Sequence, residues 1–214
     1  MKTYDRAFLF VNGSVIDLKA IALKIRNNDL LVAIDGGLRY LNKLKKTPHI
    51  LIGDLDSVSA REVQRLEKLK VDIRKFPTQK DETDLELALG MLPEFKVSKV
   101  IVAGATGDRL DHSLGNIHLL TKFQSSFELS LEDGRQEIFL VQNHTIILGK
   151  PNDIVSLIPL EAEVTGITTS NLAYPLKKET LHYASTRGIS NVMLGKTAKV
   201  RKQKGSLLCI HIRS

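Results

Sequence analysis

Three short acidic motifs lie close together in the chain: GDLDS at 53–57, KDETD at 80–84 and GDRLDH at 107–112. The chain as a whole is basic, with a formal net charge of +7 over 214 residues. Carboxylates gathered against that balance indicate a local need for them. The need that fits best is a hard cation such as Mg²⁺, which prefers oxygen ligands and usually binds together with substrate phosphates.

The first motif follows the apolar run Ile50-Leu51-Ile52, which is typical of a buried strand. Asp54 and Asp56 are two positions apart, so in extended backbone their side chains point the same way. Open α/β folds place ligands at the carboxyl ends of their strands, and Gly53 allows close backbone approach there. The alternative is that either aspartate serves as a turn residue or a helix cap.

The second motif brings Asp81 and Asp84 to a predicted helix start, where residues three apart lie on one face. Acidic residues in a first turn are also ordinary partners of the helix dipole. Lys80 beside them fits either a salt bridge or a phosphate contact. This motif alone does not decide between structure and function.

The third motif follows a strand-like run, Val100–Ala103, and a loop of small residues. Backbone amides in such a loop, with a helix start behind them, form a nest for phosphate. Arg109 can add a bidentate charge, and Asp111 can hold a metal or orient a nucleophile. Asp35-Gly36-Gly37 also follows an apolar run, although an Asp-Gly pair by itself is typical of a turn.

Several classes of protein fit the sequence poorly. It has no G-x-G-x-x-G segment for a dinucleotide, no zinc-type Cys/His spacing and no apolar run long enough to span a bilayer. Its single cysteine, Cys209, excludes an internal disulfide framework and is typical of a reducing compartment, so we expect a cytoplasmic protein without a signal peptide. The basic segment 196–204 lacks the aromatic residues of RNA-reading surfaces, and we expect neither nucleic acid nor a membrane as partner.

The elements that must position these motifs fall into two groups. Strand-like runs at 7–11, 30–34, 50–53, 71–76 and 98–103 alternate with helical patterns, which predicts a mainly parallel, Rossmann-like α/β domain over residues 1–125. Capping boxes begin at Ser59 and Thr83, and a third helix, with Leu114, Ile117 and Leu120 on one face, is expected from about 111 to 123. Residues 126–214 read as an all-β sandwich domain, with strands expected at 127–132, 136–141, 144–148, 153–158, 162–168, 189–194, 198–203 and 206–212.

Taken in this order and spacing, DGG at 35–37, GDLDS, KDETD with the helix that follows it, and GDRLDH resemble the thiamine pyrophosphokinase (thiamine diphosphokinase) family. The resemblance extends to Val155–Pro159 and to Gly188-Ile189-Ser190-Asn191 in the β half, so it covers nearly the whole chain. It implies a homodimer with active sites where the subunits meet. It also implies transfer of a pyrophosphoryl group from ATP to the hydroxyl of thiamine, with AMP released.

The resemblance also implies residue roles. Asp54, Asp56 and Asp84 would hold Mg²⁺, with Asp111 completing the catalytic set, and Ser190 and Asn191, together with Asp111, would contact thiamine. The nucleotide-binding set would be Asp35, Gly36, Gly37, Lys80, Asp81, Thr83, Thr106, Gly107, Asp108 and Arg109.

Transfer at phosphorus depends mainly on positioning and charge neutralisation, which suits such a site. Asp56 and Asp84 are both candidates for accepting the proton of the attacking alcohol. Two other interpretations were weighed: a phosphatase with Asp54 as covalent nucleophile, and an RNA-binding protein that uses segment 196–204. The phosphatase pattern expects its acidic pair after the first strand, whereas two predicted strands precede Asp54. RNA binding leaves the acidic motifs unexplained.

Overall fold

The computed structural model describes residues 4–214, which form two compact units. The first unit extends to Gly134, and the second is Arg135–Ser214. The boundary expected after residue 125 falls inside the first unit, because strand β6 (Glu128–Glu132) pairs in parallel with β5 (Lys99–Ala103). A strand that pairs along the edge of the first sheet belongs to that unit.

The first unit is built on a six-stranded parallel sheet in the order β6-β5-β1-β2-β3-β4. Every neighbouring pair in this sheet is parallel. This confirms the predicted α/β architecture. The four further strands are β1 (Arg6–Phe10), β2 (Leu30–Ile34), β3 (Ile50–Gly53) and β4 (Asp72–Lys75).

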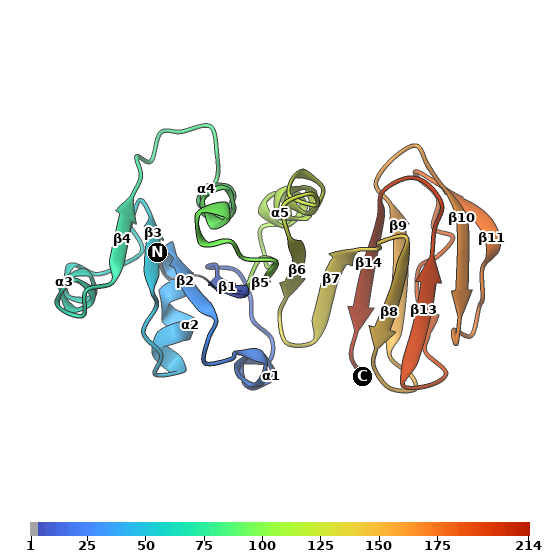
Figure 1. Cartoon of the computed structure of the whole chain (residues 1–214), viewed down its shortest axis with the longest axis horizontal. Coiled ribbons are helices and arrows are strands. Elements are labelled where there is room, and N and C mark those ends of the chain that lie inside the picture. The colour runs from blue at the N-terminus through green and yellow to red at the C-terminus, as the bar shows by residue number, and fades with distance from the viewer. Residues whose placement is uncertain (1–3) are drawn as a thin grey trace. The chain divides into compact units, whose positions relative to one another are not determined.

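Helices cover both faces of this sheet. Helices α4 (Asp84–Met91) and α5 (Leu110–Lys122) lie on one face, and α1 (Leu18–Lys24) and α2 (Leu38–Lys43) lie on the other (Figure 1). Strands β1, β2 and β3 are therefore buried along their whole length, as their apolar runs predict, and the buried Arg6 at the start of β1 pairs with Asp29. The remaining helical elements are α3 (Ala60–Lys68) and two 3₁₀ turns, η1 (Asp35–Gly37) and η2 (Leu92–Phe95). Within residues 4–214, no helix has the length and apolar character needed to cross a membrane.

At both predicted capping boxes the N-cap side chain accepts the expected backbone amide. Ser59 Oγ accepts the Glu62 amide and donates to the Glu62 carboxylate, which begins α3. Thr83 Oγ1 accepts the Glu86 amide, and this makes Asp84 the first residue of α4. The start of α4 is thus fixed by local hydrogen bonds, and with it the position of Asp84.

The predicted apolar face of α5 is correct only in part, since Leu120 is buried and Ile117 is half-buried but Leu114 is not. Leu114 is 50% exposed, whereas Ser113 and Asn116 are buried. The buried polar side chains hydrogen-bond to the preceding loop: Ser113 accepts the Gly107 amide, and Asn116 donates to the Ala105 carbonyl at 2.7 Å. Hydrogen bonds to the loop, rather than apolar burial alone, set the rotation of this helix.

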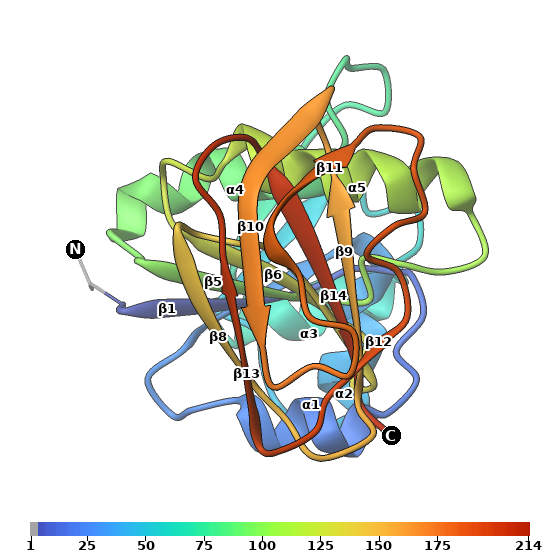
Figure 2. The same ribbon diagram turned by 90° about the vertical axis from the view of Figure 1, so that its right-hand side faces the viewer.

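The second unit is an antiparallel β-sandwich, as predicted (Figure 2). One layer has the order β11-β10-β13-β8, and the other contains β12, β9, β14 and β7 in that order. Residues such as Val155, Leu157 and Val200 fill the core between the layers. The strands are β7 (Gln136–Leu140), β8 (His144–Leu148), β9 (Ile154–Pro159), β10 (Glu163–Ser170), β11 (Lys177–His182), β12 (Asn191–Val192), β13 (Thr197–Arg201) and β14 (Leu207–Ile212).

Two strands of this unit differ from expectation. The strand expected at 189–194 shortens to the two residues of β12, because Ser190 has a φ of 59°, which extended backbone does not allow. Strand β11 was not predicted. Its sequence KKETLH has one apolar residue, Leu181, and it lies at a sheet edge, so it carries almost no hydrophobic pattern.

Candidate active site

A cleft of about 280 Å³ opens at the carboxyl ends of the parallel strands of the first unit. Its walls come from the loops after β1, β2 and β3, from the segment that leads into α4, and from the first turns of α5. Its polar lining includes Asn12, Asp35, Asp54, Thr78, Lys80 and Asp84.

A larger hollow of about 450 Å³ lies at the amino ends of β2, β3 and β4, but among the described residues that line it the only carboxylate is Asp72, which pairs with Arg74. Parallel sheets bind ligands at the carboxyl ends of their strands, and the acidic side chains gather there. The smaller cleft is therefore the candidate site.

Asp35 is held at the end of β2 by an unusual backbone. Its φ is 45°, in the left-handed region that few residue types other than Gly, Asn and Asp adopt readily. Its Oδ1 accepts the Leu55 amide at 3.1 Å. A Cβ atom at position 53 would lie 1.8 Å from this same oxygen. Gly53 of the GDLDS motif is thus needed to leave room for the aspartate of the DGG motif.

The two glycines of DGG are required by close packing. A Cβ at Gly37 would lie 2.0 Å from the carbonyl oxygen of Phe10, and one at Gly36 would lie 2.5 Å from the side chain of Asn12. The turn after β2 therefore packs directly against the end of β1. This packing brings Asn12 and Asp35 to the same cleft.

Asp54 and Asp56 do not share one environment. Asp54 lines the cleft, and the Asp56 amide donates to its Oδ1 at 3.1 Å. This hydrogen bond, with smaller contributions from Thr78 and Lys80, lowers the pKa of Asp54. The Asp56 carboxylate is exposed and accepts Ser57 Oγ at 2.9 Å. Leu55 between them has a φ of 67°, so the extended geometry that would align the two side chains is lost.

Asp84, at the start of α4, pairs with Lys80 four residues earlier in the chain. Lys80 Nζ lies 2.8 Å from Asp84 Oδ1 and also donates to the Pro77 carbonyl at 2.9 Å. The approach to Asp84 lacks hydrogen-bond geometry, so within residues 4–214 the buried Oδ1 atom has an ion-pair neighbour but no hydrogen-bond partner. A buried carboxylate oxygen with an unused lone pair can accept a further ligand.

The carboxylates also act on one another. Burial raises the pKa of Asp35 to about 7, with the Leu55 hydrogen bond opposing the rise and the nearby Asp84 and Asp54 carboxylates adding to it. Such a rise is expected where like charges share a partly buried site. A cation placed among these side chains would relieve the repulsion.

These features fit a divalent cation. The donors are carboxylate oxygens, which Mg²⁺ prefers, and the buried Asp84 Oδ1 has no hydrogen-bond partner in the described part of the chain. Within residues 4–214, no three acidic, histidine or cysteine side chains already form a complete ligand set. Mg²⁺ typically binds with one or two carboxylates and completes its shell with water and phosphate oxygens, so a partial set suits it.

The third acidic motif lies beside this cleft. Arg109 and Asp111 form an exposed ion pair at 2.6 Å, and hydrogen bonding to Arg109 lowers the pKa of Asp111 to about 2. The loop packs tightly against the end of β1: a Cβ at Gly13 would lie 2.5 Å from the Thr106 carbonyl oxygen. One amide of the expected phosphate nest, that of Gly107, is already used by Ser113. Thr106, Gly107, Asp108 and Arg109 are not among the cleft-lining residues.

A second hollow, of about 170 Å³, adjoins the cleft and shares Thr83, His112 and Asn116 with it. Asp111 lines this second hollow. The two depressions together form one acidic region along α4 and α5. Asp81, by contrast, is exposed and lines neither.

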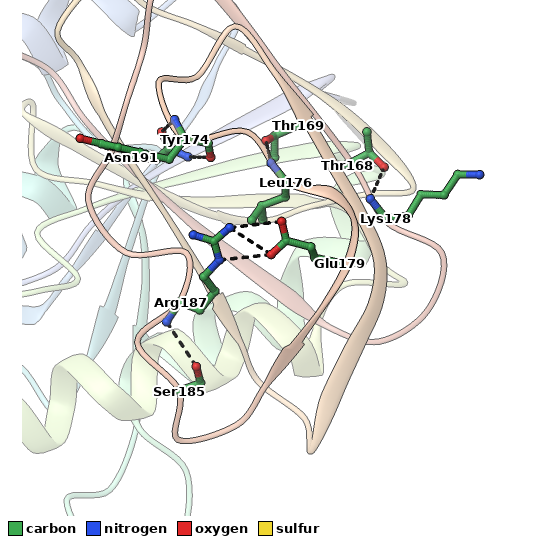
Figure 3. Close-up of polar contacts among 9 residues, drawn as sticks. All are labelled: Thr168, Thr169, Tyr174, Leu176, Lys178, Glu179, Ser185, Arg187 and Asn191. Carbon is green, nitrogen blue, oxygen red and sulfur yellow. Dashed lines mark hydrogen bonds and ion pairs between the residues drawn. The ribbon is translucent and has the colours of Figure 1, made fainter.

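In the second unit, the side chain of Asn191 holds the backbone of Tyr174 through two hydrogen bonds. Its Oδ1 accepts the Tyr174 amide at 2.9 Å and its Nδ2 donates to the Tyr174 carbonyl at 2.6 Å (Figure 3). The Ser190 amide donates to Ser156 Oγ, while the Ser190 side chain is exposed. Arg187 pairs with Glu179 in the same region (Figure 3). Ser190 is therefore presented to solvent by a segment that Asn191 anchors.

Several residues that line the cleft were not predicted from the sequence. Asn12 follows the first strand just as Asp35 and Asp54 follow theirs, so the strand-end rule could have identified it. Thr78 lies in a loop without a motif. His112 and Asn116 are one helical turn apart on α5, and the error in the face of this helix concealed Asn116.

Comparison with known proteins gives a consistent result. The family model described as "Thiamin pyrophosphokinase, catalytic domain" matches residues 21–131, and "Thiamin pyrophosphokinase, vitamin B1 binding domain" matches residues 143–207. Thiamine pyrophosphokinase of Bacillus subtilis is 30% identical over 184 residues, which cover 85% of this chain and 86% of that protein. Thiamine pyrophosphokinase 1 of Oryza sativa is 24% identical, over 80% of this chain and 69% of its own length.

Solved structures with a similar fold come from the same family of proteins. The crystal structure of thiamine pyrophosphokinase from Bacillus subtilis superimposes with a TM-score of 0.87 at 27% identity, covering 98% of this chain and 99% of that one. The crystal structure of thiamin pyrophosphokinase from Geobacillus thermodenitrificans superimposes with a TM-score of 0.84 at 25% identity, covering 98% of each chain. Both domains, their order and the fold of the whole chain are matched. The chain belongs to the thiamine pyrophosphokinase family, whose enzymes transfer a pyrophosphoryl group from ATP to thiamine.

Proposed function

We propose that the cleft lined by Asp35, Asp54 and Asp84 binds the triphosphate of ATP together with Mg²⁺. The observation that carries this proposal is the convergence on a single cleft at the strand ends of Asp35, Asp54 and the segment before and at the start of α4, which supplies Lys80, Glu82 and Asp84. Asp54 and Asp84 supply oxygens from the cleft wall, and Asp56 supplies one from the same exposed loop. Bound there, Mg²⁺ would neutralise the charge that develops on the phosphate oxygens.

The nucleotide contacts follow from the same arrangement. Lys80 and Thr83 would face the phosphates from the segment that begins α4, Asp35 would meet them with Gly36 and Gly37 packed behind it, and Asp81 would lie at the outer edge. We assign the loop Thr106, Gly107, Asp108 and Arg109 to the far end of the nucleotide. Arg109 is exposed and flexible enough to exchange its Asp111 partner for a phosphate.

The reaction needs a positioned alcohol and a proton acceptor. The hydroxyl oxygen of thiamine attacks the β-phosphorus, the bond between that phosphorus and the α–β bridging oxygen breaks, and AMP leaves. A carboxylate near the alcohol accepts its proton, an effect worth typically about 10²–10⁴-fold. Asp56 and Asp84 both remain candidates for this base.

Thiamine, a cation, suits the acidic hollow that Asp111 lines. We assign a further contact to Ser190, whose exposed side chain is presented by the segment that Asn191 anchors. By resemblance to the family, we propose a homodimer in which Ser190 and Asn191 serve the site of the partner subunit.

A cytoplasmic location completes the proposal. It is supported by the single cysteine, Cys209, which is fully buried and whose thiol pKa is raised by that burial. A chain without a second cysteine forms no internal disulfide and suits a reducing compartment.

The decisive assay is product analysis. With ATP, Mg²⁺ and thiamine all supplied, the purified protein should form thiamine diphosphate and AMP in equal amounts. Omission of thiamine or addition of EDTA should stop AMP formation. If ADP is the product, or if nucleotide turnover is independent of thiamine, the proposal is wrong.

A further inference from the structure

Lys80 occupies a special place in the cleft. It is the only lysine or arginine among the described residues that line it, and it shares the cleft with the carboxylates of Asp35, Asp54, Glu82 and Asp84. Its side chain is only 13% exposed, although lysine ordinarily keeps its ammonium in water. A lysine buried to this degree is held there by the negative charge around it.

The contacts of Lys80 are those of a counter-ion. Its ammonium lies 2.8 Å from Asp84 Oδ1, and its charge also lowers the pKa of Asp54. It also donates a hydrogen bond to the Pro77 carbonyl at 2.9 Å. The oxygen of Asp84 that it approaches is buried and has no hydrogen-bond partner among residues 4–214. The ion pair therefore balances charge without using the lone pair of that oxygen.

We propose that Lys80 and a divalent cation compete for Asp84, and that Lys80, displaced by the cation, turns to the phosphates of the nucleotide. This inference rests on the proposed function. Two cations cannot both lie within contact distance of one carboxylate oxygen without strong repulsion. Mg²⁺ uses the lone pair that the ammonium leaves unsatisfied, and lysine has the flexible four-carbon stem needed to move away.

Once displaced from Asp84, the Lys80 ammonium would contact the phosphates of the nucleotide. ATP brings a triphosphate to the same cleft, and lysine is well suited to phosphate as a mobile point charge. Lys80 thus acts as a positioning residue that links two binding events. Metal binding frees it for the nucleotide, and nucleotide binding draws it from Asp84. By linkage, each ligand must raise the affinity of the other by the same factor.

The test uses Mg²⁺ alone as the first probe, with calorimetry and thermal unfolding as readouts. Lys80→Met removes the charge and nearly keeps the length of the side chain. We expect this variant to bind Mg²⁺ at least about five-fold more tightly than the unchanged protein, a factor at the lower end of typical coupling between sites. In EDTA, its melting temperature should be lower, because the carboxylates lose their counter-ion.

The second probe is an ATP analogue whose α–β bridging oxygen is replaced by a methylene group, so that transfer cannot occur. Mg²⁺ should strengthen binding of the analogue to the unchanged protein by a larger factor than to Lys80→Met. Lys75→Met is the matched control, since Lys75 is exposed at the end of β4 and lies outside the cleft. It should behave as the unchanged protein in both measurements, and Lys80→Arg, which keeps the charge, should not show the tighter Mg²⁺ binding.

A third measurement needs no substitution. Mass spectrometry after brief acetylation should show Lys80 becoming more reactive when Mg²⁺ is added, and less reactive when the analogue follows. Unchanged or weaker Mg²⁺ binding by Lys80→Met, or unchanged reactivity of Lys80, overturns this inference while leaving the metal site intact. Absence of Mg²⁺ binding by the unchanged protein without nucleotide overturns this inference, and its absence with the analogue present overturns the proposed function as well.

Discussion

At the scale of single residues, the groups proposed to carry the chemistry are costly to the fold. Asp35 is partly buried beside two other carboxylates, and its pKa is raised to about 7. A buried carboxylate is tolerated only where it is paired or where function requires it. Substitutions in this cluster should therefore affect turnover far more than folding.

The first prediction concerns Asp54 and Asp84. Asp54→Asn or Asp84→Asn should lower turnover at least about 100-fold, because each removes charge that holds the metal and opposes the charge developing in transfer. The far-ultraviolet circular dichroism should not change. Glu67→Gln is the control, since Glu67 is exposed on α3 and the charge change is the same. More than a tenth of the activity left in both cleft variants would place the metal site elsewhere.

A second carboxylate, Asp153, stabilises the fold instead. It is 1% exposed and accepts hydrogen bonds from His211 Nε2 at 2.9 Å, the Ser214 amide at 2.9 Å and the Lys150 amide at 3.0 Å. Burial alone would raise the pKa of Asp153, but the hydrogen bonds from Ser214, His211 and Lys150 hold it at about 2. This carboxylate therefore links the stability of the second unit to pH.

The second prediction states the sign of that link. Because the folded pKa lies below the unfolded value, the contribution of Asp153 is complete above about pH 5 and is lost as the pH falls toward 2. Asp153→Asn lacks this contribution. The difference in unfolding free energy between the unchanged protein and Asp153→Asn should shrink by about 2 kcal/mol from pH 6 to pH 2 in urea titrations. A constant difference over this range would contradict the assignment, and Glu163→Gln, an exposed acid, serves as control.

At the scale of elements, the strand ends explain why the motifs were recognisable. Unbroken apolar runs predict buried parallel strands, and residues at their carboxyl ends must meet at one edge of the sheet. Asp35 and Asp54 were found in this way. The two capping boxes equally predicted where α3 and α4 begin, and with α4 the place of Asp84.

The structural features that were not predicted leave no pattern in the local sequence. The orientation of α5 depends on hydrogen bonds from Ser113 and Asn116 to a loop that is distant until the chain folds. Asp56 and Asp54 differ in environment because Leu55 between them has a positive φ. Leucine rarely adopts a positive φ, so the sequence did not predict it. The sequence predicts Lys80 as a phosphate or ion-pair residue, but its burial in a cleft lined by several carboxylates depends on the fold.

The third prediction compares one substitution at two glycines. Gly53→Ala would force a methyl group into Asp35 and strain a φ of 142°, so both activity and the melting temperature should fall. Gly90 lies in α4 with no atom within 4 Å of an added Cβ. Gly90→Ala should raise stability by about 0.5–1 kcal/mol, because alanine favours the helix. Thermal unfolding and the product assay measure both, and equal effects at the two sites would refute the packing argument.

At the scale of the molecule, the positive charge is unevenly divided. The first unit has 20 lysines and arginines against 19 aspartates and glutamates, whereas the second has 11 against 5. Three of those five acids, Glu137, Asp153 and Glu179, are paired within the second unit. The contrast between acidic motifs and a basic chain is therefore largely a contrast between two units.

The fourth prediction tests the proposed homodimer and its shared sites. Asp54→Asn and Ser190→Arg should each be nearly inactive, one through the first unit and the other through the second. If each site draws on both subunits, mixed dimers contain one site with neither change. Random exchange should then restore about a quarter of the original activity, since half of the dimers are mixed and one of their two sites is intact. Light scattering should give the mass of two chains, and a monomer, or no recovery on mixing, would contradict the shared site.

The most direct test of the central claim is a crystal structure with Mn²⁺ in place of Mg²⁺ and the methylene analogue of ATP. Anomalous scattering from Mn²⁺ locates the metal without assumptions about its ligands. The account predicts a peak within about 2.0–2.4 Å of carboxylate oxygens of Asp54 and Asp84, next to phosphate oxygens of the analogue. A metal bound away from both aspartates, with the triphosphate outside this cleft, would contradict it.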